Sequence, residues 1–174
     1  MELQILQWIQ AVFTSDFLDQ FFVTYTRLGD MGEIWIVLII ILLINKKTRK
    51  LGLLMAISLL SEFVLNDLII KPLIARPRPF QVHEVALILE APTSYAFPSG
   101  HTASSFAVVM VAFFKDYQFK FPLILLAALM AFSRLYLFVH WPTDVLAGLL
   151  LGTLVAYTVV MIDKRLTKPA DSTV

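Results

Sequence analysis

Three short blocks of the sequence contain residue types that bind and transfer phosphate. They are Lys71 to Pro79, Pro98 to His101, and Ser133 to Asp144. Together they supply lysine and arginine cations, two histidines, a carboxylate and a Ser-Gly pair that precedes an apolar run. Arginine offers paired planar donors to phosphate oxygens, and lysine adds a point charge. The combination predicts a phosphate pocket with catalytic groups beside it.

The cations and the Ser-Gly pair are the candidate phosphate ligands. Because Ser99 precedes an apolar run, it is predicted to cap a helix whose free N–H groups and positive dipole end face an anion. Gly100 lets the backbone approach closely. The predicted phosphate-binding residues are Lys71, Arg78, Arg134, Ser99 and Gly100.

The two histidines divide the remaining tasks of a metal-free phosphoryl transfer, which needs a nucleophile and an acid for the leaving oxygen. Asp144 follows His140 by four residues, so it is expected to orient that imidazole and support its positive charge. His101 is then the predicted general acid. A lone histidine in an apolar protein is usually structural, but the three blocks together favour catalysis. His83 has no such partners and is interpreted as a loop residue.

The blocks resemble the signature of the type 2 phosphatidic acid phosphatases, which share their site with the vanadium haloperoxidases. That signature is Lys, six residues, Arg-Pro; then Pro-Ser-Gly-His; then Ser-Arg, five residues, His, three residues, Asp. All eleven defined positions are filled here, and the spacing favours Arg78 over Arg76 as the motif arginine. The resemblance implies that His140 is the nucleophile, that a phosphohistidine forms, and that neither a metal nor a cofactor is needed.

The composition indicates a membrane protein. Hydrophobic residues make up 59% and the mean hydropathy is +0.79, above the average of about 45–50% apolar residues in soluble domains. A net charge of +1 argues against a nucleic-acid partner, and no obligatory protein partner is evident. Residues 1–174 are expected to form a single domain, with the motif-bearing core at about 51–163.

The predicted fold is an all-α integral membrane protein with a bundle of five to six transmembrane helices and an amphipathic N-terminal segment. A bilayer core of roughly 30 Å needs about 20 apolar residues per helix. Residues 1–28 have apolar and polar residues interleaved at helical spacing, which predicts either an interfacial helix or part of a poor first span that continues to Tyr25. Five spans are predicted: Met31 to Asn45, Leu51 to Ile70, Pro98 to Phe114, Phe121 to Val139, and Thr143 to Ile162.

The cations segregate between the two ends of these spans, and cytoplasmic loops retain lysine and arginine. All three blocks fall at the opposite ends of the spans, so they are expected to meet on the extracytoplasmic side of a bacterial cytoplasmic membrane. Val85 to Leu89, in the long outer loop, is predicted to form a short helix. The nine cations assigned to the cytoplasm are Lys46, Lys47, Arg49, Lys50, Lys115, Lys120, Lys164, Arg165 and Lys168.

These inferences predict dephosphorylation of a lipid phosphate or diphosphate, with membrane lipids as surroundings. The sequence does not distinguish undecaprenyl diphosphate, phosphatidylglycerol phosphate and phosphatidic acid. One alternative is a non-enzymatic lipid-phosphate transporter or binding protein, which needs the cations but not the His-Asp pair. A haloperoxidase is another, and it requires bound vanadate. Glu62 and Asp67, inside a predicted span, are equally compatible with a structural and a functional role.

Overall fold

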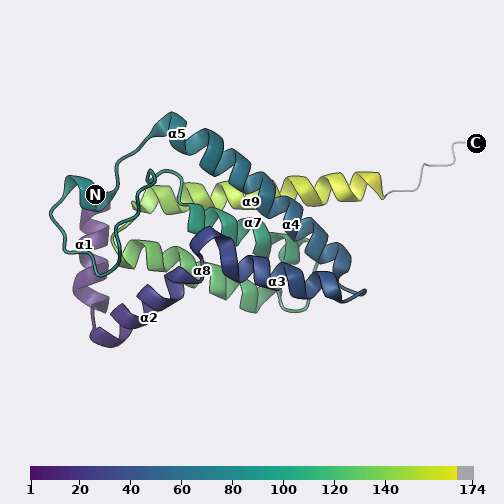
Figure 1. Cartoon of the computed structure of the whole chain (residues 1–174), viewed down its shortest axis with the longest axis horizontal. Helices are drawn as coiled ribbons and strands as arrows, with labels where there is room; N and C mark the ends of the chain where they lie inside the picture. The colour runs from purple at the N-terminus through teal and green to yellow at the C-terminus, as the bar shows by residue number, and fades with distance from the viewer. Residues whose placement is uncertain (168–174) are drawn as a thin grey trace, which may run out of the picture.

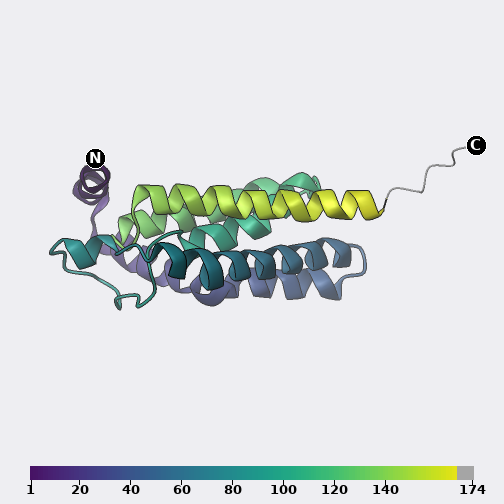
Figure 2. The ribbon, with the colours of Figure 1, turned by 90° about the horizontal axis from the view of Figure 1, so that it is seen from above.

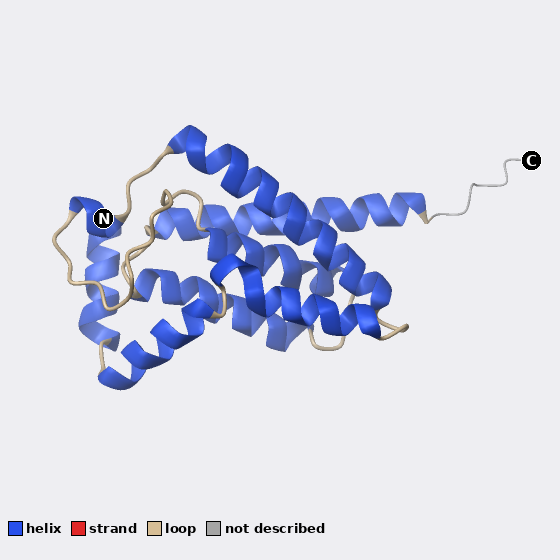
Figure 3. Cartoon of the chain, in the orientation of Figure 1, coloured by secondary structure: helices blue, strands red, loops and turns tan. Residues whose placement is uncertain are grey.

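The computed structural model describes residues 1–167, and every regular element in that range is helical (Figure 3). This confirms the all-α prediction. The long elements are α3 (Glu33–Ile44), α4 (Arg49–Phe63), α7 (Gly100–Phe114), α8 (Lys120–Tyr136) and α9 (Pro142–Leu166). They lie side by side as an elongated bundle (Figures 1 and 2). The other elements are α1 (Glu2–Phe13), α2 (Asp16–Arg27), η1 (Asp30–Gly32), η2 (Val64–Ile70), α5 (Lys71–Ile74) and α6 (Pro79–Val82).

Helix α7 lies at the centre of the bundle, with α4, α8 and α9 packed against it. Ten of its side chains, from Thr102 to Ala112, are buried. Two hydrogen bonds tie it to neighbours through polar groups inside the apolar core: Trp35 Nε1 donates to Ser105 Oγ (2.9 Å), and Ser58 Oγ donates to the Ala107 carbonyl (2.7 Å). The start of α7 carries the Ser-Gly-His block, so this central helix fixes the position of that block.

Helices α7 and α9 approach closely through two glycines of α9. A Cβ at Gly148 would lie 2.6 Å from the Ser99 carbonyl oxygen, and one at Gly152 would lie 2.3 Å from that of Ala103. Small residues one turn apart let membrane helices pack backbone against backbone. This contact holds the beginning of α9, which carries Asp144, against the beginning of α7.

The N-terminal region forms two helices rather than one continuous span. The chain is extended at Ser15, whose hydroxyl accepts a hydrogen bond from the Leu18 amide and caps α2. Helix α1 crosses the end of the bundle at a steep angle, while α2 leans along α8 (Figures 1 and 2). With 12 residues each, these helices are about 18 Å long. The structure therefore contradicts a continuous first span to Tyr25.

The segment between α4 and α7 differs from the prediction at two places. The predicted span to Ile70 ends as a π-helix, η2, that runs directly into α5. No helix forms at Val85 to Leu89; the short helix of this segment is α6, which begins at Pro79. Proline at a first helical position has its φ angle preset and needs no N–H partner, so the helix begins there.

By length and composition, two helical segments of the described chain are long and apolar enough to cross a membrane: Arg49–Val82 and Pro142–Leu166. Gly100–Phe114 is apolar but shorter. The α3–α4 turn, the α7–α8 turn and the end of α9 lie together at one end of the bundle, opposite α1 (Figure 1). Eight of the nine cations assigned to the cytoplasm lie on these segments; the ninth, Lys168, falls outside the described residues.

Candidate active site

The structure brings the three blocks together at the end of the bundle crossed by α1. From the first to the third block, Arg78 Nη1 lies 3.1 Å from His140 Nε2. From the first to the second, Lys71 Nζ lies 3.0 Å from where a Cβ would sit on Gly100. From the second to the third, the Ser99 amide donates to the Asp144 carbonyl (3.0 Å). The candidate site is thus built from helix ends and from the loop between α8 and α9.

His140 lies in that loop and is only 1% exposed. Arginine has only donors, so the His140 Nε2 that faces Arg78 is the unprotonated nitrogen, and the proton resides on Nδ1. Burial lowers the pKa of His140 well below its ordinary value, and the charges of Arg78 and Arg134 act in the same direction. His140 is therefore neutral at neutral pH, with the Nε2 lone pair available for attack on an electrophile.

Asp144 lies behind the imidazole, in the first turn of α9. Its Oδ2 is 3.5 Å from His140 Nδ1, beyond hydrogen-bond distance, and the buried Nδ1 has no other partner. The same Oδ2 accepts from the Trp141 amide (2.8 Å), and Oδ1 accepts from Arg76 Nη1 (2.6 Å). Catalytic hydrogen bonds are often long in ligand-free sites and tighten when substrate binds. Asp144 is in position to orient the ring.

The three predicted phosphate cations are all buried. Arg78 donates through Nε to the Ser94 carbonyl (2.7 Å) and through Nη1 to the Val139 carbonyl (2.8 Å). Burial lowers the pKa of Arg78 to about 10 despite the opposing effect of Asp144, so it stays charged at neutral pH. Arg134 donates to Thr26 Oγ1, but its Nε has no partner. Lys71 pairs with Asp67.

The Ser-Gly pair lies at the start of α7, as predicted, but Ser99 does not cap the helix with its side chain. Ser99 occupies the N-cap position and makes no side-chain cap hydrogen bond. Its buried hydroxyl instead accepts from Thr102 Oγ1 (3.1 Å). The first-turn N–H groups of α7 therefore donate no hydrogen bond to this hydroxyl. At Gly100, a side chain would fill the space beside Lys71 Nζ.

His101 lies on the side of the site that faces α2 and η1. Its Nε2 is 3.1 Å from Asp30 Oδ1 and 3.2 Å from the Thr26 carbonyl oxygen. Both partners are acceptors, so Nε2 carries a proton. Because Thr26 also receives a hydrogen bond from Arg134, this threonine links the predicted acid to a predicted phosphate cation. The ring of His83 packs edge-on against Trp141, and the His83 side chain makes no hydrogen bond to a motif residue.

Four residues at the site escaped the sequence analysis: Arg76, Glu2, Thr26 and Asp30. Arg76 bridges Asp144 and Glu2, with 2.6 and 2.7 Å contacts. Its Arg-Pro pair was visible in the sequence, but spacing favoured the neighbouring pair. Asp30 precedes a predicted span, which marks a helix end without indicating a histidine partner. Nothing in the local sequence signals Glu2 or Thr26.

Glu62 lies in the last turn of α4, directly before the π-helix, and is 1% exposed. Glu62 Oε1 accepts from Asn66 Nδ2 (2.8 Å), and the same nitrogen lies 3.7 Å from a Cβ position on Gly100. Glu62 therefore lies one residue removed from the site, whereas Asp67 contacts Lys71 directly.

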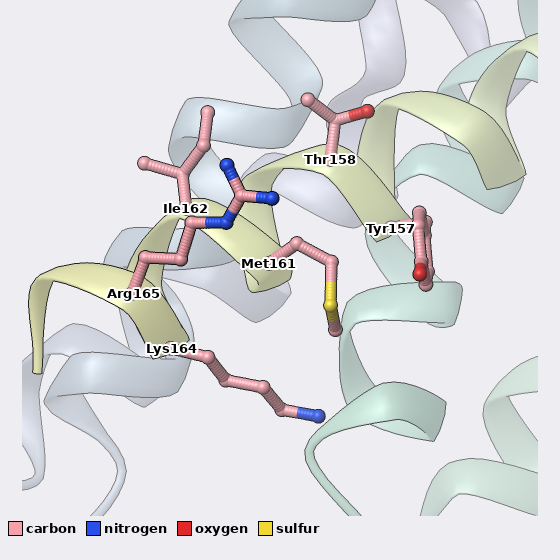
Figure 4. Close-up of a pocket in the computed structure, with 6 residues that line it drawn as sticks. All are labelled: Tyr157, Thr158, Met161, Ile162, Lys164 and Arg165. Carbon is pink, nitrogen blue, oxygen red and sulfur yellow. The ribbon is translucent and has the colours of Figure 1, made fainter. Parts of the chain in front are cut away.

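A surface hollow of about 480 Å³ lies far from these residues, along the final turns of α9. The residues drawn in Figure 4 include two cations, Lys164 and Arg165, but no histidine or carboxylate. It offers no group for phosphoryl transfer. Within residues 1–167, no cluster of three or more histidine, aspartate or glutamate side chains is arranged to hold a metal ion.

Comparison with known proteins points to one family. The family model described as PAP2 superfamily matches residues 47–168. The chain is 38% identical to an undecaprenyl-diphosphatase of Sulfolobus acidocaldarius over 75% of this chain and 64% of that protein. It is 30% identical to the undecaprenyl-diphosphatase BcrC of Bacillus subtilis, over 80% and 72% of the two chains.

A solved structure agrees along nearly the whole chain. The crystal structure of a transmembrane PAP2 type phosphatidylglycerolphosphate phosphatase from Bacillus subtilis superposes with a TM-score of 0.79 at 29% identity, and it covers 97% of this chain and 86% of that one. The match of the family model to more than half of the chain, together with this shared architecture, shows that the chain belongs to the PAP2 superfamily.

Proposed function

We propose that this chain is a metal-independent lipid phosphatase that works through a phosphohistidine on His140. The observation that carries the proposal is the state of that ring: Nε2 accepts from Arg78 and is unprotonated, and Nδ1 lies 3.5 Å from Asp144 Oδ2. A nucleophilic nitrogen thus faces buried cations, and a carboxylate lies behind it. A protein that only binds or transports lipid phosphate does not need this pairing.

In the first step, His140 Nε2 attacks phosphorus and the bond from phosphorus to the lipid oxygen breaks. Lys71, Arg78 and Arg134 stabilise the charge on the phosphoryl oxygens, because fixed donors act strongly in a dry site. His101 enters this step protonated on both nitrogens: it gives one proton to the departing lipid oxygen and keeps the Nε2 proton that faces Asp30 and the Thr26 carbonyl. Asp144 supports the charge on the His140 ring. In the second step, water attacks the phosphohistidine, releases phosphate and restores the proton to His101.

The reaction requires the site to open. His140, Ser99 and Asp144 are almost fully buried, and Arg78 is covered by the segment that carries Ser94 and Tyr95. Tyr95, whose carbonyl oxygen lies 3.4 Å from Arg78 Nη2, is itself 48% exposed. A phosphate that reaches His140 must take the place of Arg78 against Nε2, so Arg78 exchanges a histidine contact for a phosphate contact.

We further propose that five helical segments cross the membrane: α3, α4 with η2 and α5, α7, α8, and α9. The polar site then faces the extracytoplasmic side, because the lysine-rich turns lie at the other end. Helix α1, which crosses the bundle end, lies in the outer interface with Trp8 and Val12 exposed. A lipid headgroup at that interface is level with the site.

The candidate substrates are undecaprenyl diphosphate and phosphatidylglycerol phosphate. The names of the relatives support both, since two are undecaprenyl-diphosphatases and one structural neighbour is a phosphatidylglycerolphosphate phosphatase. Both lipids present a terminal phosphate to the same cations, and the site residues contact only that end. Specificity constants on the purified protein rank the two lipids.

The test is the His140→Ala variant, assayed with both lipids in detergent and excess chelator. We expect phosphate release to fall by at least about 10³-fold, because removal of a nucleophile disables the whole catalytic group. A quench of the wild type in alkaline detergent, with a lipid labelled in its terminal phosphate, should leave label on the protein that acid treatment then removes, and the variant should carry none. Chelator-resistant turnover by His140→Ala would overturn the assignment.

A further inference from the structure

An ion-pair chain runs from the beginning of α1 to the nucleophile. Glu2 contacts Arg76, Arg76 contacts Asp144, and Asp144 lies beside His140. We propose that α1 positions the nucleophile, with Glu2 and Arg76 as positioning residues that act through Asp144. The inference rests on the role proposed above for His140, and it extends the site to a helix that carries none of the motif residues.

Arg76 fixes the orientation of the Asp144 carboxylate. Its guanidinium is a rigid planar fork: Nη1 lies 2.6 Å from Asp144 Oδ1, and Nη2 lies 2.7 Å from Glu2 Oε2. The other Asp144 oxygen accepts from the Trp141 amide. With both oxygens held, the carboxylate cannot rotate away from His140 Nδ1. Arg76 also supplies the positive charge nearest to a carboxylate that is fully buried.

Glu2 ties α1 to the start of α9. Its Oε1 accepts from the Thr143 amide (3.1 Å) and from Thr143 Oγ1 (2.6 Å), so it satisfies an N–H group in the open first turn of α9. Burial acts to raise the pKa of Glu2, but hydrogen bonds from Thr143 and Arg76 outweigh it and lower the pKa. Glu2 is therefore charged at neutral pH. It contacts Thr143, the residue directly before Asp144.

The apolar face of α1 covers the loop that holds His140. Leu6, fully buried, packs with Phe138 and Trp141, and Ile9 packs with Leu137 and Val139. Phe138 has a φ of 60°, a left-handed conformation that costs a residue with a bulky side chain about 1–3 kcal/mol and persists only when its surroundings enforce it. Helix α1 supplies part of that enforcement two residues before His140.

The decisive variants are Arg76→Gln and Glu2→Gln in the full chain. For Arg76→Gln we expect kcat to fall by about 10–100-fold, as is typical when the partner of a catalytic group is removed. KM and the inhibition constant of inorganic phosphate should stay within about twofold, because Lys71, Arg78 and Arg134 are untouched. Glu2→Gln should show a smaller loss of the same kind. Glu84→Gln, exposed at the same end of the bundle, and Lys47→Gln, exposed at the opposite end, are the controls and should retain wild-type kcat.

A pH profile separates positioning from a merely structural role. The groups that face Asp144 are Arg76, the Trp141 amide and His140, with Arg78 nearby and Glu2 behind Arg76. Loss of the Arg76 charge favours protonation of the Asp144 carboxylate. In a plot of kcat against pH, the fall at low pH (the acid limb) should therefore move to higher pH in Arg76→Gln. Arg76→Lys keeps the charge but not the fork, and should restore the acid limb without restoring kcat. The double variant Glu2→Gln/Arg76→Gln should show no larger fall in kcat than Arg76→Gln alone, because both residues act through Asp144.

Failure of the positioning role and failure of the proposed His140 mechanism give different results. An inactive His140→Ala with an unchanged Arg76→Gln, in both kcat and pH profile, would overturn the positioning role and leave the nucleophile in place. A fall in kcat accompanied by a raised KM, a lower melting temperature and an unmoved acid limb would also overturn it. Wild-type KM and melting temperature with a lowered kcat and a shifted acid limb would support it.

Discussion

The two ends of the bundle both pair basic residues with aspartates, but they hold these charges in different ways. At the end opposite the site, Asp163 accepts from Lys50 and Lys115, each at 2.8 Å, with a side-chain exposure of 55% for Lys50. At the site end, Arg78 and Arg134 are each 2% exposed. The lysines of the far end thus keep contact with water, whereas the two arginines of the site end are removed from it.

Buried polar atoms without a hydrogen-bond partner are also concentrated at the site end. Three buried side-chain atoms among the described residues lack a hydrogen-bond partner: Asn66 Oδ1, Arg134 Nε and His140 Nδ1. All three belong to the site or to the helix beside it. Buried charge without full pairing is unfavourable for folding. The site end therefore retains groups that stability alone does not favour, and such groups are typical of catalytic centres.

The largest expected effect comes from Arg134→Met, which removes one of these buried charges. We expect kcat/KM on either candidate lipid to fall by about 10²–10³-fold, the usual loss when one donor to a developing charge is removed. The melting temperature in detergent should stay level or rise, because an incompletely paired buried cation is replaced by an apolar side chain of similar length.

The matched control is Lys115→Met at the opposite end. It removes a partly exposed cation that is paired with Asp163, and it should leave kcat/KM within about twofold of the wild type. If Arg134→Met lowered the melting temperature and kept its activity, the contrast between the two ends would be reversed, and Arg134 would be a structural residue.

A second variant tests the scaffold that both ends share. Gly152→Ala places a Cβ 2.3 Å from the Ala103 carbonyl oxygen, where α9 meets α7. Overpacking of this kind costs about 1–3 kcal/mol, so the melting temperature should fall, and activity should fall with it. Leu150→Ala, on an exposed position of the same helix, is the control and should change neither. Unlike Arg134→Met, this variant should not separate stability from activity.

A third prediction uses pH to detect the buried histidine. The pKa of His140 is well below its ordinary value in the folded chain, whereas the unfolded chain protonates this residue near pH 6.5. Between these values the unfolded state binds more protons, so the free energy of unfolding rises with pH there and levels off above about 6.5. Acidification below that pH should lower the melting temperature of the wild type. The fall should be smaller in His140→Gln, and an equal fall would assign it to other groups.

The sequence was sufficient to predict the all-helical fold and the end of the bundle where the site forms. Each motif block coincides with a helix end, and the cations segregate between the two ends, so both features are local in the chain. The break between α1 and α2 was not predicted, although Ser15 followed by Asp16 and Asp19 is typical of a helix start. Residues 1–28 remained ambiguous because their apolar spacing fits either an interfacial helix or part of a first span.

The missed contacts are those that connect distant parts of the chain. Glu2 and Thr143 are separated by 141 positions, and no local pattern relates them. Arg76 and Arg78 stand in identical Arg-Pro pairs, and only the fold of the loop directs one to Asp144 and the other to His140. The Ser99 hydroxyl is an exception, because its partner Thr102 is only three residues away. Spacing alone does not specify whether a hydroxyl at a helix start accepts from a backbone N–H or from a nearby side chain.

The smallest expected effect is that of Asp163→Asn, which removes the carboxylate from the hydrated end. Exposed ion pairs contribute about 0.2–1 kcal/mol each, and salt screens them further. The variant should lower the melting temperature slightly at low salt and by less at high salt, with kcat/KM unchanged. A thermal melt at two ionic strengths measures this directly. A large loss that persists in high salt would mean that water does not reach this cluster, and the two ends would then differ in function but not in how they hold charge.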